Sequence, residues 1–159
     1  MSALIDVRNL TKVYTTGGRT LELFRDLSFA VAVGEMVAIV GESGAGKSTL
    51  LHMLAALDTP TSGDVVVDGV PLGTLTGAQQ SEFRNRTVGY VWQFHYLLPE
   101  FTAEENVAMP LLARGVSRAS ALVEARKWLA EVELGDRLTN RSGELSGGEQ
   151  QRVSLARAL

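Results

Sequence analysis

The chain has 159 residues, of which 45% are hydrophobic and 21% charged, and its formal net charge is −3. This length suits one domain with one buried core, and the negative charge argues against the broad basic surface of a nucleic-acid binder. The sequence contains no cysteine, which excludes disulfides and thiolate metal sites, and no apolar stretch approaches the roughly 20 residues that a bilayer span needs. We therefore expect a cytoplasmic protein that reaches a membrane only through a partner.

The first quarter of the chain predicts strands. Leu4–Val7 and Leu21–Phe24 mix apolar and polar residues in short runs, and Gly17–Gly18 between them is typical of a turn. Met36–Val40 is instead a continuous apolar run, as expected of a central parallel strand covered on both faces. A glycine-rich loop and a predicted helix from Lys47 to about Ala56 follow, which indicates the start of an α/β unit.

Further strands and a polar helix are predicted before the middle of the chain. Asp64–Val67 predicts a strand that ends at the turn Asp68–Gly69. Residues 77–86 are polar and predict a helix, and Val88–Val91 predicts a second core strand.

The second half of the chain predicts helices, each with a recognisable start. Thr102 followed by Glu105 is a capping-box pattern that opens a short helix, which Pro110 should end or kink. A longer helix is expected over Ser117–Glu133, and Ser146 can cap a last helix that runs to the chain end.

The strongest chemical signal is the segment Gly41–Ser48, which fits the pattern G-x-x-x-x-G-K-S/T at every fixed position. Glycines let successive N–H groups turn inward towards phosphate oxygens, and the following helix adds its N-terminal dipole. Lys47 would bridge the β- and γ-phosphates, which makes it a candidate catalytic residue, and the Ser48 hydroxyl would bind Mg²⁺. The expected contacts to ATP are Gly41, Glu42, Ser43, Gly44, Ala45, Gly46, Lys47, Ser48 and Thr49. Kinases, GTPases, helicases and transporters share this loop, so it does not name a function.

A second glycine-rich motif lies at Leu145–Arg152, with the sequence LSGGEQQR. Ser146 would cap a helix whose first-turn N–H groups stay bare at Gly147 and Gly148, which makes an anion site without a lysine. The alternative is an ordinary capped helix with a glycine-rich entry.

Together, the phosphate loop and this motif resemble the ABC ATPase family, whose signature is LSGGQ or close to it. The resemblance implies an α/β P-loop NTPase fold with an N-terminal antiparallel β part and a helical subdomain that carries the signature. It also implies ATP and Mg²⁺ as cofactors, and a head-to-tail homodimer in which two subunits clasp each ATP. Ser146, Gly147 and Gly148 of one subunit would then contact the γ-phosphate bound by the other.

The same resemblance suggests roles for two further residues. Tyr14 stands where the family carries an aromatic that stacks on adenine, although it could equally be a strand residue packed on the core. Gln93 stands where the family carries the Q-loop glutamine, a candidate catalytic and metal-contacting residue that senses Mg²⁺ and the attacking water. Without the family, a lone glutamine after a strand would more often face solvent.

Three segments narrow the resemblance to the ATPase subunits of lipoprotein-releasing (Lol) transporters. They are Leu57–Val65, Gln93–Thr102 and Glu105–Leu112, with departures at Tyr96 and at Ala55–Ala56. This implies a peripheral protein on the cytoplasmic face of the bacterial inner membrane, bound to integral membrane subunits and not to nucleic acid. ATPases of macrolide or peptide exporters are the nearest alternative, since they share much of this segment.

The family pattern also implies that the single ABC ATPase domain over residues 1–159 is incomplete. About residues 1–92 would form the RecA-like core with its β subdomain, and about 93–159 the Q-loop, the helical subdomain and the signature helix. The Walker B aspartate, catalytic glutamate and switch histidine would follow Leu159, so we expect a truncated member that hydrolyses little ATP alone. A fragment that binds nucleotide without hydrolysis is therefore an alternative. A DNA-maintenance or translation ATPase is disfavoured, because residues 49–144 show no sustained heptads and no basic run.

Large apolar residues gather after Gln93, including Phe94, Tyr96, Leu98 and Phe101. They exceed what a solvated loop needs. They could form the core of a small helical subdomain, or a docking cleft for a cytoplasmic helix of the membrane subunits, as the resemblance implies.

Overall fold

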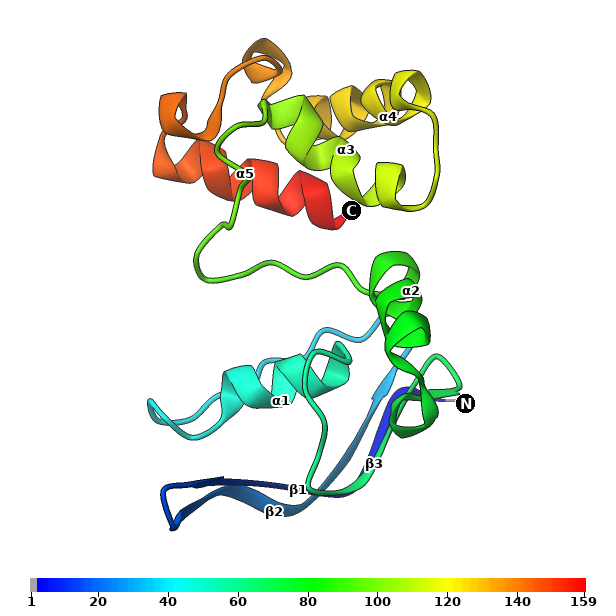
Figure 1. Cartoon of the computed structure of the whole chain (residues 1–159), viewed down its shortest axis with the longest axis vertical. Coiled ribbons are helices and arrows are strands. Elements are labelled where there is room, and N and C mark those ends of the chain that lie inside the picture. Colours follow the sequence, from blue (N-terminus) through cyan, green and yellow to red (C-terminus); the bar gives the residue numbers. More distant parts are fainter. Residues whose placement is uncertain (1–2) are drawn as a thin grey trace. The chain divides into compact units, whose positions relative to one another are not determined.

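The computed structural model describes residues 3–159, which form two compact units, one ending at Arg84 and the other running from Asn85 to Leu159 (Figure 1). The division expected near residue 92 separates a RecA-like core from a helical subdomain, and it stays a prediction. None of the helices in the described range has the length and apolar character of a membrane span.

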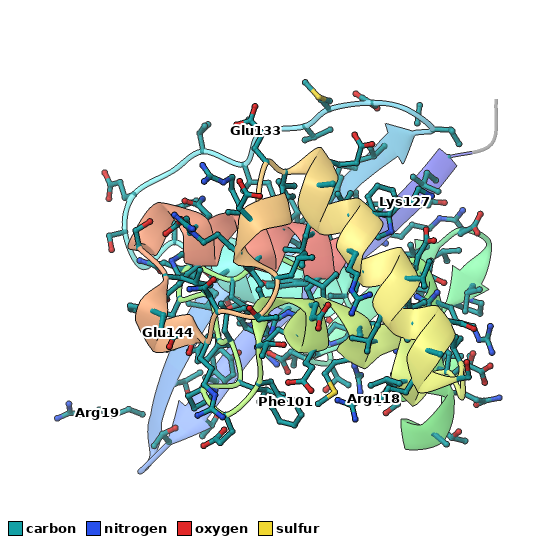
Figure 2. All side chains as sticks on the ribbon, turned by 90° about the horizontal axis from the view of Figure 1, so that it is seen from above. Arg19, Phe101, Arg118, Lys127, Glu133 and Glu144 are labelled. Atoms are coloured by element: carbon teal, nitrogen blue, oxygen red, sulfur yellow. The ribbon has the colours of Figure 1, made fainter. Side chains whose placement is uncertain are left out.

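The first unit is built on an antiparallel sheet in the order β2-β1-β3-β4. Strands β1 (Ala3–Thr16) and β2 (Arg19–Ala32) form a long hairpin, which confirms the strands and the turn predicted there (Figure 1). Both turn glycines, Gly17 and Gly18, have positive φ, as a two-residue hairpin turn requires. The side chain of Arg19, directly after this turn, extends away from the ribbon (Figure 2).

Strand β3 (Ser62–Val67) pairs with β1 on the other side and then with β4 (Val70–Pro71), so the predicted strand over Asp64–Val67 is confirmed. Val7 and Val65 face each other across β1 and β3, and both are buried. Helix α1 (Lys47–Leu54) packs against β3 and contributes Met53 to this core. Residues 72–74 form a short 3₁₀ turn, and α2 (Gly77–Thr87) confirms the predicted polar helix.

Two predicted strands are not formed in the described chain. Met36–Val40 has no regular secondary structure, and the Met36 and Val40 side chains are 97% and 87% exposed. A strand exists only through hydrogen bonds to a neighbour, and the sheet of the described residues contains no strand that pairs with this run. Val88–Val91 lacks a strand for the same reason. The predictions of strands at Met36–Val40 and Val88–Val91 are therefore wrong for the described structure. The apolar residues of Met36–Val40, on which the first prediction rests, are exposed.

The second unit is helical, with α3 (Ala103–Ala113), α4 (Arg118–Glu131) and α5 (Gly147–Ala158) in mutual contact. Short 3₁₀ turns lie at Gly135–Arg137 and Ser142–Glu144 between α4 and α5. The buried core consists of Ala103, Val107, Ala108, Ala121, Ala125, Leu129, Leu134, Leu145, Val153 and Ala156.

The predicted helix starts of this unit are confirmed. Thr102 and Glu105 form the capping box of α3, and Ser117 caps α4 through the Ser120 N–H. Pro110 does not end α3, which continues to Ala113.

Candidate functional site

The phosphate loop is a glycine-rich turn that enters α1 directly. Gly41, Gly44 and Gly46 all have positive φ, which residues with a Cβ rarely adopt. A Cβ on Gly46 would also lie 3.1 Å from the Leu23 Cβ and 3.2 Å from the Phe24 ring. The backbone conformation therefore favours glycine where the loop becomes helix, and a Cβ there would also crowd the side chains of β2.

The Lys47 side chain folds back over this loop. Its ammonium donates hydrogen bonds to the carbonyl oxygens of Gly41 at 2.8 Å and of Glu42 at 2.6 Å. A positive charge is thus held at the centre of the glycine turn by weak, neutral acceptors. An anion that enters the loop offers the ammonium a stronger, charge-assisted partner.

The N-terminus of α1 is open to a ligand. Gly46 occupies the N-cap position and gives no side-chain cap hydrogen bond. The first-turn N–H groups of a helix have no intrahelical partner and carry partial positive charge. Ser48 is exposed on this turn and Thr49 is half-buried, while Glu42, Ser43 and Ala45 are exposed in the loop. The predicted phosphate contacts are therefore gathered at one helix end.

Tyr14 lies in the same unit, on β1, and its side chain is 40% exposed. Its hydroxyl donates to Asp58 Oδ2 at 2.7 Å. The Lys12 ammonium donates to Asp58 Oδ1 at 2.8 Å and lies 4.6 Å from the centre of the Tyr14 ring. Burial works to raise the pKa of Asp58, but hydrogen bonds from Lys12, Tyr14 and the Thr59 backbone outweigh it and hold the pKa below its ordinary value. Asp58 is therefore charged at neutral pH.

The second motif begins α5 in the other unit. Ser146 is the N-cap and accepts from the Glu149 N–H, and the Glu149 carboxylate accepts from the Ser146 N–H at 2.8 Å and from its hydroxyl at 2.7 Å. Arg137 pairs with Glu149 at 3.0 Å. The hydrogen bonds from Ser146, joined by that from Arg137, lower the pKa of Glu149 to about 2. The predicted cap is confirmed, with a carboxylate partner that was not anticipated.

Gln93 is exposed in a segment without helix or strand. Shortly after it, the backbone carbonyls of His95 and Tyr96 accept hydrogen bonds from the Arg157 guanidinium at 2.7 and 2.9 Å. Burial lowers the pKa of Arg157. The structure thus ties the segment after Gln93 to the end of α5, while the role of Gln93 itself stays a prediction.

Sequence reasoning missed four residues around these motifs: Lys12, Asp58, Glu149 and Arg157. Two of them had a usable signal. Lys12 and Tyr14 are two apart on a strand and so share a face, and Glu149 stands three residues after Ser146, which is the capping-box spacing. The partners of Asp58 and Arg157 are far away in the sequence and left no local pattern.

A protein-family model described as ABC transporter matches residues 24–159. The chain belongs to the ABC transporter family. It is 63% identical over 150 residues to a protein of Koribacter versatilis named lipoprotein-releasing system ATP-binding protein LolD, which covers 94% of this chain and 67% of that protein. A protein of the same name from Geobacter metallireducens is 54% identical over all of this chain and 71% of its own length.

Solved structures agree with this assignment. A dimeric ATP-binding cassette in a post-hydrolysis state with ADP and Pi matches with a TM-score of 0.90 and 36% identity, over 98% of this chain and 68% of that one. A dimeric bacterial ABC transporter cassette matches with the same score at 35% identity, over the same shares of the two chains. The predicted ABC ATPase fold and the resemblance to Lol-type ATPases are therefore confirmed, and the chain is a member of an ATP-binding family.

Proposed function

We propose that this chain is the ATP-binding subunit of a lipoprotein-releasing transporter and that it holds the ATP phosphates in the loop Gly41–Thr49. The observation that carries this is the Lys47 ammonium, poised over the Gly41 and Glu42 carbonyls beside an uncapped helix start. The names of the relatives support lipoproteins as the transported class. The exporter alternative is not favoured, because the relatives described above carry the lipoprotein-releasing name.

Magnesium fits this loop as a partner of the nucleotide. Among the described residues no group of three His, Cys, Asp or Glu side chains could hold a metal ion. Mg²⁺ commonly keeps few protein ligands and binds substrate phosphates. The exposed Ser48 hydroxyl would supply a ligand here, and Gln93 would supply a second contact and orient the attacking water.

The base and the second subunit complete the proposed site. Tyr14 would stack on adenine, which a partly exposed ring permits. The two cassettes described above are dimeric, and we propose a head-to-tail homodimer for this chain too. Ser146, Gly147 and Gly148 of one copy would then meet the γ-phosphate held by the other.

Lys47→Ala tests the site directly. We expect ATP affinity to fall by about 100-fold, since a charge-assisted contact to phosphate is lost. Titration calorimetry with ATP measures this, and Lys127→Ala, which removes an exposed lysine paired with Glu124 on α4, is the matched control. ATP affinity unchanged by Lys47→Ala would remove the phosphate-loop assignment.

We further propose that the chain works as a peripheral subunit on the cytoplasmic face of the inner membrane, docked on integral membrane subunits through the segment after Gln93. Phe94 and Tyr96 are 67% and 63% exposed there, and Leu98 is 40% exposed. Single exposed apolar residues are ordinary, but a cluster of this size marks an interaction surface.

Phe94→Ala with Leu98→Ala should lower co-purification with the membrane subunits and lipoprotein release together, while ATP binding persists. Val123→Ala with Leu155→Ala, which removes two other exposed apolar side chains of the same unit, is the control. A folded double variant that still assembles normally would place the docking surface elsewhere.

A further inference from the structure

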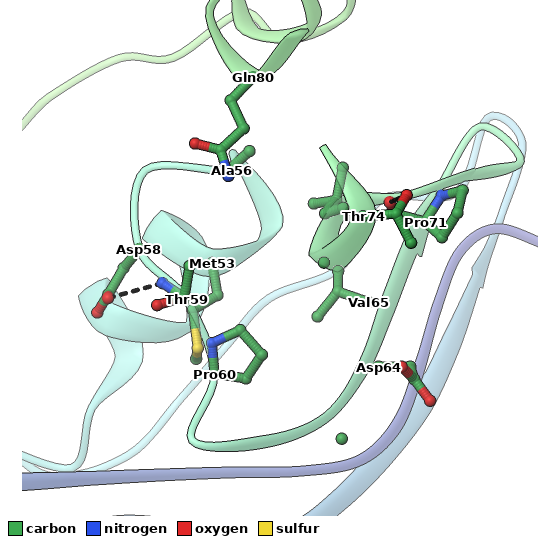
Figure 3. A pocket seen from close by; sticks show the side chains of 13 residues that line it. Met53, Ala56, Asp58, Thr59, Pro60, Asp64, Val65, Pro71, Thr74 and Gln80 are labelled. Atoms are coloured by element: carbon green, nitrogen blue, oxygen red, sulfur yellow. Dashed lines mark hydrogen bonds between the residues drawn. The ribbon is translucent and has the colours of Figure 1, made fainter. Parts of the chain in front are cut away.

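A buried lysine links the sheet to the segment that follows α1. Lys12 is only 7% exposed, and its ammonium donates to Asp58 Oδ1 at 2.8 Å and to the Thr59 carbonyl at 2.7 Å. A buried ammonium is costly unless it is paired and hydrogen-bonded. Asp58 supplies the paired charge and Thr59 a further acceptor. Both residues line a pocket of about 210 Å³. Figure 3 shows them there, with the Asp58 carboxylate accepting from the Thr59 N–H.

The same carboxylate fixes the Tyr14 ring. Oδ2 of Asp58 accepts the Tyr14 hydroxyl at 2.7 Å, so each oxygen of Asp58 is committed to a different side chain of β1. The ring is therefore held at its hydroxyl end by a hydrogen bond to a charged group, which is stronger than one to a neutral acceptor.

Lys12 also decides which face of the ring is available. Its ammonium lies over the ring, 4.6 Å from the centroid, and so occupies one face. Tyr14 is 40% exposed, so we take the opposite face as the one that a flat ligand would use. A cation on one face also draws π-electron density, which favours stacking of an electron-rich base on the other.

Asp58 is in turn attached to the helix that begins at the phosphate loop. Its N–H donates to the His52 carbonyl of α1 at 3.3 Å, and the Leu57 N–H donates to the same oxygen at 2.8 Å. Helix α1 and these hydrogen bonds therefore connect Lys47 to Asp58, and Asp58 to Tyr14. A helix keeps the spacing between its two ends fixed.

We propose that Asp58 is a positioning residue for the nucleobase, which sets the free face of Tyr14 at a fixed place relative to the phosphate loop and keeps Lys12 on the other face. This rests on the proposed role of Tyr14 in ATP binding and adds to it. Asp58 does not touch the nucleotide; it acts through Tyr14 and Lys12.

Comparison of ATP with inorganic tripolyphosphate tests the proposal, because tripolyphosphate lacks the base. Asp58→Asn should weaken ATP about three- to tenfold, the range expected for an aromatic stacking contact, and leave tripolyphosphate unchanged. Tyr14→Phe, which removes only the hydroxyl, should weaken ATP by a smaller factor in the same selective way. Asp64→Asn, an exposed carboxylate-to-amide change at the same pocket, is the matched control and should change neither affinity.

Asp58→Asn leaves the Lys12 ammonium without a counter-charge, so its folding must be checked by thermal unfolding. If Asp58→Asn unfolds, two other variants test the proposal. Asp58→Asn with Lys12→Met removes both charges, and Tyr14→Phe removes only the hydrogen bond to Asp58. In a Tyr14→Ala background, Asp58→Asn should cost no further ATP affinity, because the ring through which it acts is gone.

The outcomes separate this inference from the function on which it rests. If Tyr14→Ala binds ATP as wild type does, the stacking role fails, and the positioning role fails with it. If Tyr14→Ala weakens ATP while Asp58→Asn and Tyr14→Phe do not, only the positioning role of Asp58 is overturned. Equal losses of ATP and tripolyphosphate in a folded Asp58→Asn variant would assign Asp58 to structural support and also overturn the proposal.

Discussion

Helices α1 and α5 both begin at glycine-containing motifs, but their first turns differ. At α1 the N-cap is Gly46, no side chain caps the helix, and the positive charge of Lys47 lies folded over the loop. At α5 the N-cap is Ser146, and Glu149 returns to it to complete a capping box. The start of α1 has no side-chain cap, whereas the start of α5 is capped by its own side chains.

The two helices differ in what lies at the N–H groups of their first turns. Every helix N-terminus offers free N–H groups and a positive dipole. At α1 no side chain caps these N–H groups, and the Lys47 ammonium adds positive charge beside them. In the signature a carboxylate, balanced by Arg137, stabilises the helix without any ligand. Phosphate that approaches α5 must share the Ser146 hydroxyl with Glu149, so we expect the signature to contribute only when a partner subunit presents a bound nucleotide.

The largest expected contrast comes from adding a methyl group at each motif. Gly46→Ala forces a Cβ into a left-handed conformation, at 3.1 Å from Leu23, and should cost about 2 kcal/mol of stability or more and abolish tight ATP binding. Gly148→Ala meets nothing within 4 Å and lies inside a helix, so stability should stay the same or rise slightly. Urea unfolding and ATP calorimetry measure both. Equal destabilisation by the two changes would contradict the comparison.

A smaller effect is expected from removing the serine cap. Ser146→Ala takes away the acceptor for the Glu149 N–H and should lower the free energy of unfolding by about 1 kcal/mol. ATP affinity of the isolated subunit should not change, because its own phosphate loop is intact. Ser117→Ala at the start of α4, which caps through the Ser120 N–H, is the control for an ordinary cap. A loss of ATP affinity in the monomeric Ser146→Ala protein would contradict the expectation that an isolated subunit binds ATP through the loop before α1 and not through the start of α5.

The smallest effect concerns pH. The pKa of Glu149 is lowered from 4.5 to about 2 by hydrogen bonds from Ser146 and Arg137. A lowered carboxyl pKa contributes stability that is present above the unfolded value and is lost as pH falls through the folded value. Wild-type stability should therefore decline between about pH 4.5 and 2 more steeply than that of Glu149→Gln, as measured by urea unfolding at several pH values. Parallel pH profiles of the two proteins would show that Glu149 titrates normally.

Local patterns were enough to predict much of the fold and most of the motif residues. The hairpin turn at Gly17–Gly18, the capping box at Thr102 and Glu105 and the glycine-rich loop Gly41–Ser48 depend on residues within a few positions of each other, and spacing alone predicts each of them. The capping box at Ser146 and Glu149 has the same spacing, but its carboxylate partner was missed. The order β2-β1-β3-β4 could not be read in this way, since pairing joins residues such as Val7 and Val65 across a long stretch of chain.

The sequence by itself determined the glycine-rich loop that enters α1, because such a loop needs only neighbouring residues to fix its shape; that this loop binds phosphate stays our proposal. Only the tertiary structure decided that Asp58 meets Lys12 and Tyr14, and that Arg157 holds the carbonyls of His95 and Tyr96. It also decided that Met36–Val40 is not a strand here, although its composition favours one. The reason is the same in each case: a hydrogen bond or a strand pair between distant residues exists only when folding supplies the partner, and no local pattern of residue types encodes which partner that is.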